Sequence, residues 1–213
     1  MAKLNVLLVP VTPFQQNCSI IIDDDTKLAA VVDPGGDVPR LLQAIKQTGA
    51  KVEKIILTHG HIDHAGGAAE LKHKLGVPIE GPHLADKFLL DTLPASGARF
   101  GILDAREVTP DRWIEDGDEV TIGGLTFGCI TAPGHSPGSV VYFNEANRFA
   151  LMGDVLFQGS IGRTDLPGGS HATLLASIRD KILPLGDDVV FLPGHGDASR
   201  IGVERTSNPF LVG

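Results

Sequence analysis

The amino-acid sequence predicts an α/β fold in which two β-sheets pack face to face and helices cover their outer surfaces. Short apolar runs bounded by turn residues gather in two blocks along the chain, and each block is typical of a sheet. Helical periodicity occurs between the strands of the first block and late in the second. Four of the apolar runs end in histidine or aspartate close to glycine, which predicts a common rim where strands of both sheets finish.

The first block predicts strands that alternate with two helices. Apolar residues at helical spacing predict one helix over 39–47, which ends at Thr48-Gly49, and another over 64–75, which ends at Gly76. The second helix connects two strands, so a β-α-β unit is expected there. The predicted strands cover residues 5–9, 19–22, 29–32, 54–57 and 77–80.

The second block predicts a further sheet and one long helix. Asp116-Gly117-Asp118 and Gly123-Gly124 are turn signals on either side of its first strand. A helix is predicted over 170–183, and strands over 119–122, 125–131, 139–143, 148–152 and 188–192. Between the blocks, residues 82–110 are less regular, with a short helix near 84–91 and then a loop that contains proline and glycine.

Composition narrows the class of protein. A chain of 213 residues with 42% hydrophobic content suits one core, so we expect a single domain over 1–213. The formal charge of -8 argues against a nucleic-acid partner and favours a small-molecule substrate. Cys18 and Cys129 lie far apart in apolar stretches, as reduced core thiols do. No apolar stretch reaches the roughly 20 residues of a membrane span, and we expect a cytoplasmic protein without a membrane partner.

A dense group of potential metal ligands follows the predicted strand 54–57. His59, His61 and His64 lie within six residues, together with Asp63. A single histidine at a strand end is usually a hydrogen-bonded loop residue, but three so close together favour a metal site, because imidazole and carboxylate are ligands that zinc prefers. His59 and His61 alternate along an extended chain, whereas Asp63 and His64 follow at a turn. The spacing therefore predicts two adjacent metal positions.

Three later strand ends supply further ligand types. Predicted strands are followed by Pro133-Gly134-His135, by Gly153-Asp154 and by Pro193-Gly194-His195. Glycine and proline permit tight turns there, which would bring the side chains together at one edge.

In this order, His59-x-His61-x-Asp63-His64, His135, Asp154 and His195 resemble the metallo-β-lactamase superfamily. The segment 153–165 and the ending 204–210 are similar to those of single-domain glyoxalase II-like hydrolases. The resemblance covers nearly the whole chain. It implies an αββα sandwich with two metal positions at the open edge of its sheets.

The resemblance also implies which residues hold each metal. It makes His59, His61 and His135 ligands of the first ion, and Asp63, His64 and His195 ligands of the second, with Asp154 as the bridge. Two divalent ions are expected, with zinc preferred and iron or manganese as alternatives. Neither cysteine matches a ligand position, and Asp154 stands where a cysteine-ligated β-lactamase has its sulfur.

The activity implied is hydrolysis of a glutathione thioester such as S-D-lactoylglutathione through a metal-bound hydroxide. Asp63 would be both a ligand and the group that orients the nucleophile. Arg163 would face the glutathione carboxylates, or instead pair with Asp165 to fix its loop. Few residues follow His195, so the C-terminal helical domain of two-domain glyoxalase II is not expected, and a broader thioesterase stays open.

Two other functions remain as alternatives. The segment 162–165 also resembles persulfide dioxygenases, in which one iron would be held by His59, His135 and Asp154. The presence of a complete second ligand set favours the dinuclear hydrolase. A non-catalytic metal-binding module is the other alternative, although structural zinc is usually closed by four ligands.

Overall fold

Two β-sheets form the centre of the molecule in the computed structural model, which describes residues 2–212. The first sheet has the order β1-β2-β3-β4-β5, with β1 Leu4–Val11, β2 Gln16–Asp23, β3 Leu28–Val32, β4 Lys51–Ile56 and β5 Ile79–Glu80. The second has the order β13-β12-β9-β8-β7-β6, with β6 Glu119–Ile122, β7 Leu125–Thr131, β8 Val140–Asn144, β9 Phe149–Gly153, β12 Val190–Pro193 and β13 Ser199–Arg200. A separate hairpin pairs β10 Leu156–Phe157 with β11 Ser160–Ile161.

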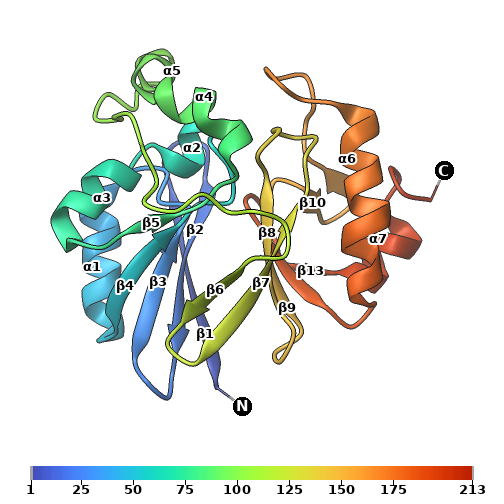
Figure 1. Cartoon of the computed structure of the whole chain (residues 1–213), viewed down its shortest axis with the longest axis horizontal. Coiled ribbons are helices and arrows are strands. Elements are labelled where there is room, and N and C mark those ends of the chain that lie inside the picture. The colour runs from blue at the N-terminus through green and yellow to red at the C-terminus, as the bar shows by residue number, and fades with distance from the viewer. Residues whose placement is uncertain (1, 213) are drawn as a thin grey trace.

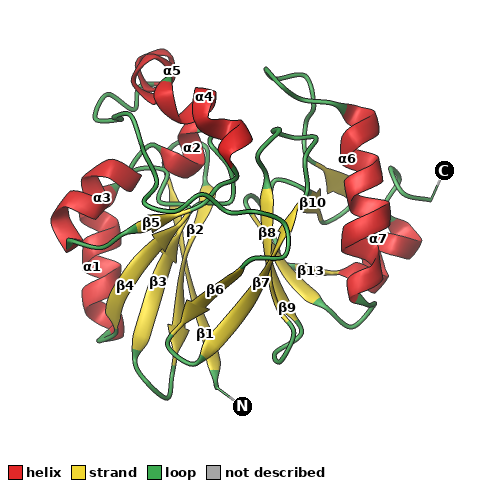
Figure 2. Cartoon of the chain, in the orientation of Figure 1, coloured by secondary structure: helices red, strands yellow, loops and turns green. Residues whose placement is uncertain are grey.

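Helices lie on the outer sides of both sheets (Figures 1 and 2). The first sheet is covered by α1 Val38–Thr48 and α3 Ala68–Leu75, and the second by α6 His171–Ser177 and α7 Ile201–Ser207. The helix α6 continues through a π-helical turn η2 Ile178–Ile182 and a 3-10 turn η3 Leu183–Leu185. Beyond the strand ends at the top of Figure 1 lie α2 Ile62–Ala65, the 3-10 turn η1 Leu84–Asp86, α4 Lys87–Asp91 and α5 Leu93–Phe100.

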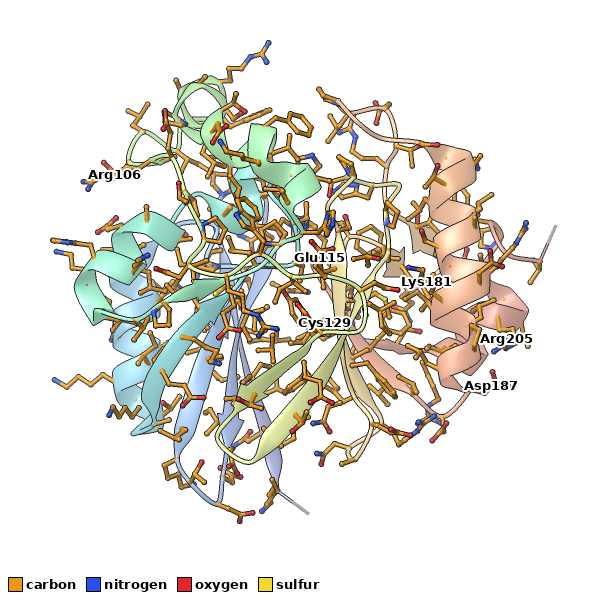
Figure 3. All side chains as sticks on the ribbon, viewed as in Figure 1. Arg106, Glu115, Cys129, Lys181, Asp187 and Arg205 are labelled. Carbon is orange, nitrogen blue, oxygen red and sulfur yellow. The ribbon has the colours of Figure 1, made fainter. Side chains whose placement is uncertain are left out.

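Three apolar cores lie between these layers and hold them together. Along β2, Ile20 and Ile22 pack in the core under α1 and α3, whereas Ile21 between them packs in the core that joins the two sheets. This alternation follows the two-residue period of a strand. Figure 3 labels Cys129 on β7, which belongs to the core between the sheets, and a third core joins the second sheet to α6. The structure thus confirms the predicted αββα sandwich.

Strand directions bring four chain segments to one edge of the sandwich. In the first sheet β4 runs parallel to β3, and β2 runs antiparallel to β3. In the second sheet β9 runs parallel to β12, and β7 shares their direction because β8 is antiparallel to both β7 and β9. The carboxyl ends of β4, β7, β9 and β12 therefore lie together, with the start of β2 beside them.

Two predictions for the first half of the chain were wrong in detail. The helix expected over 64–75 is broken into α2 and α3 at Gly66-Gly67. A side chain at Gly67 would lie 2.7 Å from the carbonyl oxygen of Pro34, so the close approach of that loop requires glycine. The loop expected after residue 91 contains α5, which accommodates Pro94 in its first turn and ends at Gly101 with φ 77°.

The second half also holds elements that the sequence did not predict. The short strands β10, β11 and β13 are two residues each, too short to show a strand period, and α7 was not foreseen. The helix predicted over 170–183 is α-helical only to Ser177, and Ser170 caps its start by accepting a hydrogen bond from the Thr173 N–H. Among residues 2–212, the helices are too short or too polar to cross a membrane.

Candidate metal centre

Seven side chains gather at the edge where the strands of both sheets end. Those that follow β4 come from the first sheet, and those that follow β7, β9 and β12 come from the second. They form three overlapping groups of three donor atoms, and within each group all donors lie within 4.8 Å of one another. One group consists of His59, His64 and Asp154, and it shares a residue with each of the other two. We call His59, His61 and His135 the first trio, and Asp63, His64 and His195 the second trio.

The first trio consists of three imidazoles with closely spaced nitrogens. His135 Nε2 lies 3.2 Å from His59 Nε2 and 2.9 Å from His61 Nδ1. His59 and His135 are buried, and His61 is partly exposed. Three imidazole nitrogens this close together are a donor set suited to zinc or iron.

The second trio combines one carboxylate with two imidazoles. Asp63 Oδ2 lies 3.0 Å from His195 Nε2 and 3.8 Å from His64 Nε2. Asp154 lies between the trios, because its Oδ2 is 3.5 Å from His135 Nε2 and 3.7 Å from His195 Nε2. Its other oxygen, Oδ1, is 3.3 Å from His64 Nε2. The structure thus brings all seven predicted residues together, with Asp154 in a position to serve both trios.

Unpartnered polar atoms test whether this arrangement fits metal ions. Among residues 2–212, the buried side-chain atoms without a hydrogen-bond partner include His64 Nε2 and Asp154 Oδ1. A buried polar atom without a partner costs about 1–3 kcal/mol, so a fold retains it for a reason. The two atoms lie 3.3 Å from each other. A divalent cation would satisfy both, and the seven residues therefore fit metal binding.

The protonation of His59 and His61 also suits a cation. Burial lowers the pKa of His59 well below its ordinary value, and nearby imidazoles add to that shift. Burial, followed by the effect of His135, lowers the pKa of His61 to about 4. Both rings are consequently neutral near pH 7 and present lone pairs, as a metal ligand must.

The second trio lies in acidic surroundings. Burial lowers the pKa of His64, but the negative charges of Asp154 and Asp63 raise it by a larger amount. The net shift of the pKa is therefore upward. Burial raises the pKa of Asp154, yet His64 outweighs it and the net shift is downward. The second trio therefore favours a positive charge, which either a proton or a metal cation can supply.

A buried hydrogen-bond chain connects one ring of each trio. Asp33 Oδ2 accepts from His64 Nδ1 at 2.9 Å and from the Thr58 hydroxyl at 2.7 Å, and Asp33 Oδ1 accepts from the Thr58 N–H at 2.7 Å. Thr58 Oγ1 lies 3.0 Å from His59 Nδ1 and accepts from it when its own proton points to Asp33. With this arrangement both rings keep a proton on Nδ1, so Nε2 is the nitrogen that is left to bind a metal ion.

Comparisons with known proteins place this fold and site in a family. The model of the metallo-beta-lactamase superfamily matches residues 11–195, which include all seven side chains. The chain belongs to the metallo-β-lactamase superfamily. Hydroxyacylglutathione hydrolase GloC of Haemophilus influenzae is 46% identical over 209 residues, which cover 98% of each chain.

Solved structures of the superfamily agree with the fold. A structure described as BLEG-1 B3 metallo-beta-lactamase superimposes with a TM-score of 0.90 at 39% identity, over 98% of this chain and all of that one. TTHA1623 in a di-iron-bound form superimposes with a TM-score of 0.87 at 33% identity, over 96% of this chain and all of that one.

Glycine at position 194 allows His64 and Asp154 to lie close to the turn that carries His195. A side chain at Gly194 would lie 2.5 Å from His64 Cε1 and would also collide with Asp154 Oδ1. The residue precedes His195 and closes the turn after β12. Glycine is required there because the backbone itself forms part of the wall around the ligands.

Arg163 lies at the rim of the site and pairs with a neighbour. Its Nε and an amino nitrogen donate to the two oxygens of Asp165 at 2.7 and 2.8 Å, and both side chains are more than 60% exposed. The Arg163 carbonyl accepts from His135 Nδ1 at 2.8 Å. This hydrogen bond leaves His135 Nε2 directed at the other two rings of the first trio, His59 and His61. The ion pair between Arg163 and Asp165, which was one of the two alternatives, is thus present. The backbone of Arg163 also contacts the candidate metal centre through His135.

The remaining histidines and the cysteines lie apart from the trios. His73 and His171 are exposed, and His83 accepts from the Ala85 N–H at the start of η1. Both cysteines are buried and free, as expected, and burial raises the pKa of Cys129 to about 12.

The sequence analysis missed two carboxylates that hold residues of the candidate metal centre. Asp33 follows the strand β3 and precedes Pro34-Gly35, so it carries the same strand-end signal as the four predicted ligand segments. Asp86 carries no such signal, because it ends the short 3-10 turn η1 and does not follow an apolar strand. Burial raises the pKa of Asp86, while hydrogen bonds from Ser136 and from the Gly60 and Gly138 N–H groups oppose that shift.

Proposed function

We propose that this chain is a metal-dependent thioester hydrolase that acts on S-D-lactoylglutathione or related glutathione thioesters. The observation that carries the proposal is the pair of ligand trios that share Asp154. The near-complete match in length to a relative named as a hydroxyacylglutathione hydrolase supports the substrate class. We further propose two divalent ions, one on each trio. Zinc suits the imidazole and carboxylate donors best, with iron or manganese as alternatives.

The two ions, when bound, supply an activated water for attack on the thioester carbonyl and stabilise the negative charge that develops on its oxygen. The protein contributes a carboxylate that orients the attacking water. Burial raises the pKa of Asp63, but His64 and the hydrogen bond from His195 lower it by a larger amount. The net shift of the pKa is downward, so this carboxylate is ionised near pH 7. Asp63 is partly exposed, and its Oδ2 is the oxygen that pairs with His195, so we propose that Oδ1 accepts a hydrogen bond from the nucleophile.

The leaving group makes little demand on the protein. A thiol has a pKa near 8.5, so the thiolate departs with little help from a general acid. A thioester hydrolase therefore needs no additional general acid beside the metal ligands and the residues that position them. The chemistry of the donor set therefore suits thioesters better than substrates with a poor leaving group.

Arg163 is our proposed contact for the substrate carboxylates. Its ion pair with Asp165 is exposed, and an exposed pair contributes only about 0–1 kcal/mol, so a carboxylate of the substrate can replace Asp165 at small cost. A guanidinium also binds a carboxylate through two parallel hydrogen bonds. Removal of Arg163 should raise KM and leave kcat nearly unchanged.

The test is steady-state hydrolysis of S-D-lactoylglutathione and a panel of small thioesters, with metal analysis on the same sample. We expect two metal equivalents, cleavage of glutathione thioesters, and loss of both activity and metal in His59→Ala and Asp154→Ala. Arg163→Ala should lose affinity for glutathione thioesters but not for a thioester without carboxylates. An unchanged KM for both would remove Arg163 from the substrate site.

Rival activities are outcomes of the same experiment. Stoichiometric iron, oxygen uptake with glutathione persulfide and no thioester cleavage would identify a persulfide dioxygenase instead. A β-lactam belongs in the panel because one of the matched structures is described as a B3 metallo-beta-lactamase. Faster cleavage of the β-lactam than of every thioester would contradict the proposed substrate class.

A further inference from the structure

The side chain of Asp86 is fully buried, and its carboxylate receives three hydrogen bonds. Oδ2 accepts from the Gly60 N–H at 2.8 Å and from the Ser136 hydroxyl at 2.8 Å. Oδ1 accepts from the Gly138 N–H at 2.6 Å. Asp86 ends the 3-10 turn η1, just before α4, in the part of the chain for which the sequence suggested no role.

All three donors belong to segments that carry the first trio. Gly60 lies between His59 and His61, and Ser136 directly follows His135. These segments come from different sheets, since the first follows β4 and the second follows β7. A single carboxylate therefore joins the two backbone segments whose separation sets the spacing of the three imidazoles. We propose that Asp86 is a positioning residue that builds the first metal position by holding these segments together.

The residues around Asp86 pack closely against the two segments that carry the first trio. A side chain at Gly60 would lie 2.9 Å from Leu89 Cβ, and one at Gly138 would lie 2.6 Å from Asp86 Cγ. The Gly138 carbonyl also accepts from the His83 N–H at 3.2 Å. The start of α4 thus rests directly on both ligand segments, and the carboxylate is the charged group at the centre of that contact.

The second trio is held by other contacts. His64 Nδ1 is bound by Asp33, and the turn that carries His195 is bound by Asn17, whose amide donates to the carbonyls of Pro193 and Gly196 at 3.1 and 2.8 Å. The proposal therefore predicts an asymmetric effect. Loss of the Asp86 carboxylate should weaken the ion on the first trio and leave the ion on the second trio nearly unchanged.

Asparagine is the smallest change that tests this role. Three donors converge on two carboxylate oxygens, whereas an asparagine offers one oxygen and one amino group. In either orientation the amino group faces a buried N–H or hydroxyl donor, so at least one hydrogen bond is lost and the two segments are pushed apart. Changes to residues that orient metal ligands typically weaken metal binding about 10- to 100-fold.

Asp23 provides a matched control. It is also buried and accepts three hydrogen bonds, from the Thr26 hydroxyl and from the Asp25 and Gly124 N–H groups. Like Asp86, it joins the first sheet to a segment of the second, because Gly124 lies in the turn between β6 and β7. It ends β2, whose other end adjoins the metal centre, so it lies about 23 Å from the ligands. Asp23→Asn should destabilise the fold without any effect on metal binding.

The experiment is a zinc titration of the metal-free full chain in competition with a chromophoric chelator. His61→Ala and His195→Ala identify which binding step belongs to which trio. In Asp86→Asn we expect the step of the first trio to weaken about 10- to 100-fold, the other step to stay within about threefold, and Asp23→Asn to match the unaltered chain at both steps. Identical titrations of Asp86→Asn and Asp23→Asn, or equal weakening of both steps in Asp86→Asn, would overturn the proposal.

A gentler pair of variants covers the case in which Asp86→Asn does not fold. Ser136→Ala removes one hydroxyl donor to Asp86, and Thr26→Ala removes the corresponding donor to Asp23. Ser136→Ala alone should weaken the first step, by a smaller factor, and equal titrations of the two variants would overturn the proposal. The inference rests on the proposed metal centre but not on the substrate. A chain that shows this asymmetry yet cleaves no thioester would refute the proposed function only, and an active two-metal chain without the asymmetry would refute only the role of Asp86.

Discussion

Asp33→Asn disturbs the hydrogen-bond chain that connects the two trios. The carboxylate accepts from the Thr58 N–H, the Thr58 hydroxyl and His64 Nδ1, at 2.7, 2.7 and 2.9 Å. In the better orientation of the asparagine, its oxygen serves the hydroxyl and the imidazole, and its amino group faces the Thr58 N–H. One buried donor is then left without an acceptor, which costs about 1–3 kcal/mol. For a chain of this length that corresponds to a fall in Tm of about 2–12 °C.

Metal binding should respond at both trios. His64 contacts Asp33 directly, and His59 contacts it through the Thr58 hydroxyl, so both rings lose part of the support that fixes their orientation. We expect both zinc-binding steps to weaken about 10-fold or more. This result differs from that expected for Asp86→Asn, in which one step changes.

The assay combines thermal unfolding of the metal-free chain with the zinc competition titration, and Asp23→Asn again serves as the buried-carboxylate control. The reasoning is refuted if Asp33→Asn unfolds at the same temperature as the unaltered chain. It is refuted equally if a lower Tm is accompanied by unchanged zinc affinity, because the carboxylate would then stabilise the strand end without orienting the ligands.

Three further predictions concern single positions. Gly194→Ala places a methyl group against His64 and Asp154, so we expect a loss of at least about 100-fold in kcat/KM and reduced metal content in a folded chain; full activity would show that the turn can shift. Tyr142→Phe removes the phenol that donates to the Leu57 carbonyl at 2.8 Å in the core between the sheets, and the free energy of unfolding in urea should fall by about 1–3 kcal/mol. Burial holds Cys129 protonated with a pKa of about 12, so a thiol reagent at pH 8 should label neither cysteine before unfolding and both afterwards, and rapid labelling of the native chain would contradict the burial.

The sequence was informative wherever a local pattern determines the structure. The strand around Ile20 to Ile22 follows a simple apolar pattern. The segments that carry the predicted ligands follow such runs as well, so both the sheets and the seven side chains could be found without coordinates. Asp33 was within reach of the same reasoning, since it directly follows an apolar strand and precedes Pro34-Gly35.

Other features depend on contacts that no local pattern records. Asp86 acquires its role from hydrogen bonds to residues 26, 50 and 52 positions away in the chain. The break at Gly66-Gly67 is required by the approach of Pro34, which lies in a different loop. The ion pair between Arg163 and Asp165 is local, but whether it or a substrate occupies the guanidinium depends on binding and not on the chain alone.

Each trio draws donors from both sheets: the first takes His135 from the second sheet, and the second takes His195 from it, while their partners come from the segment after β4. An ion on either trio would therefore act as a cross-link between the two sheets of the sandwich. Separation of the sheets at this edge would require release of the metal, so the rate at which the edge opens would depend on metal supply. Resistance to proteolysis at these loops would then report on how much metal the chain holds, even in the absence of any substrate.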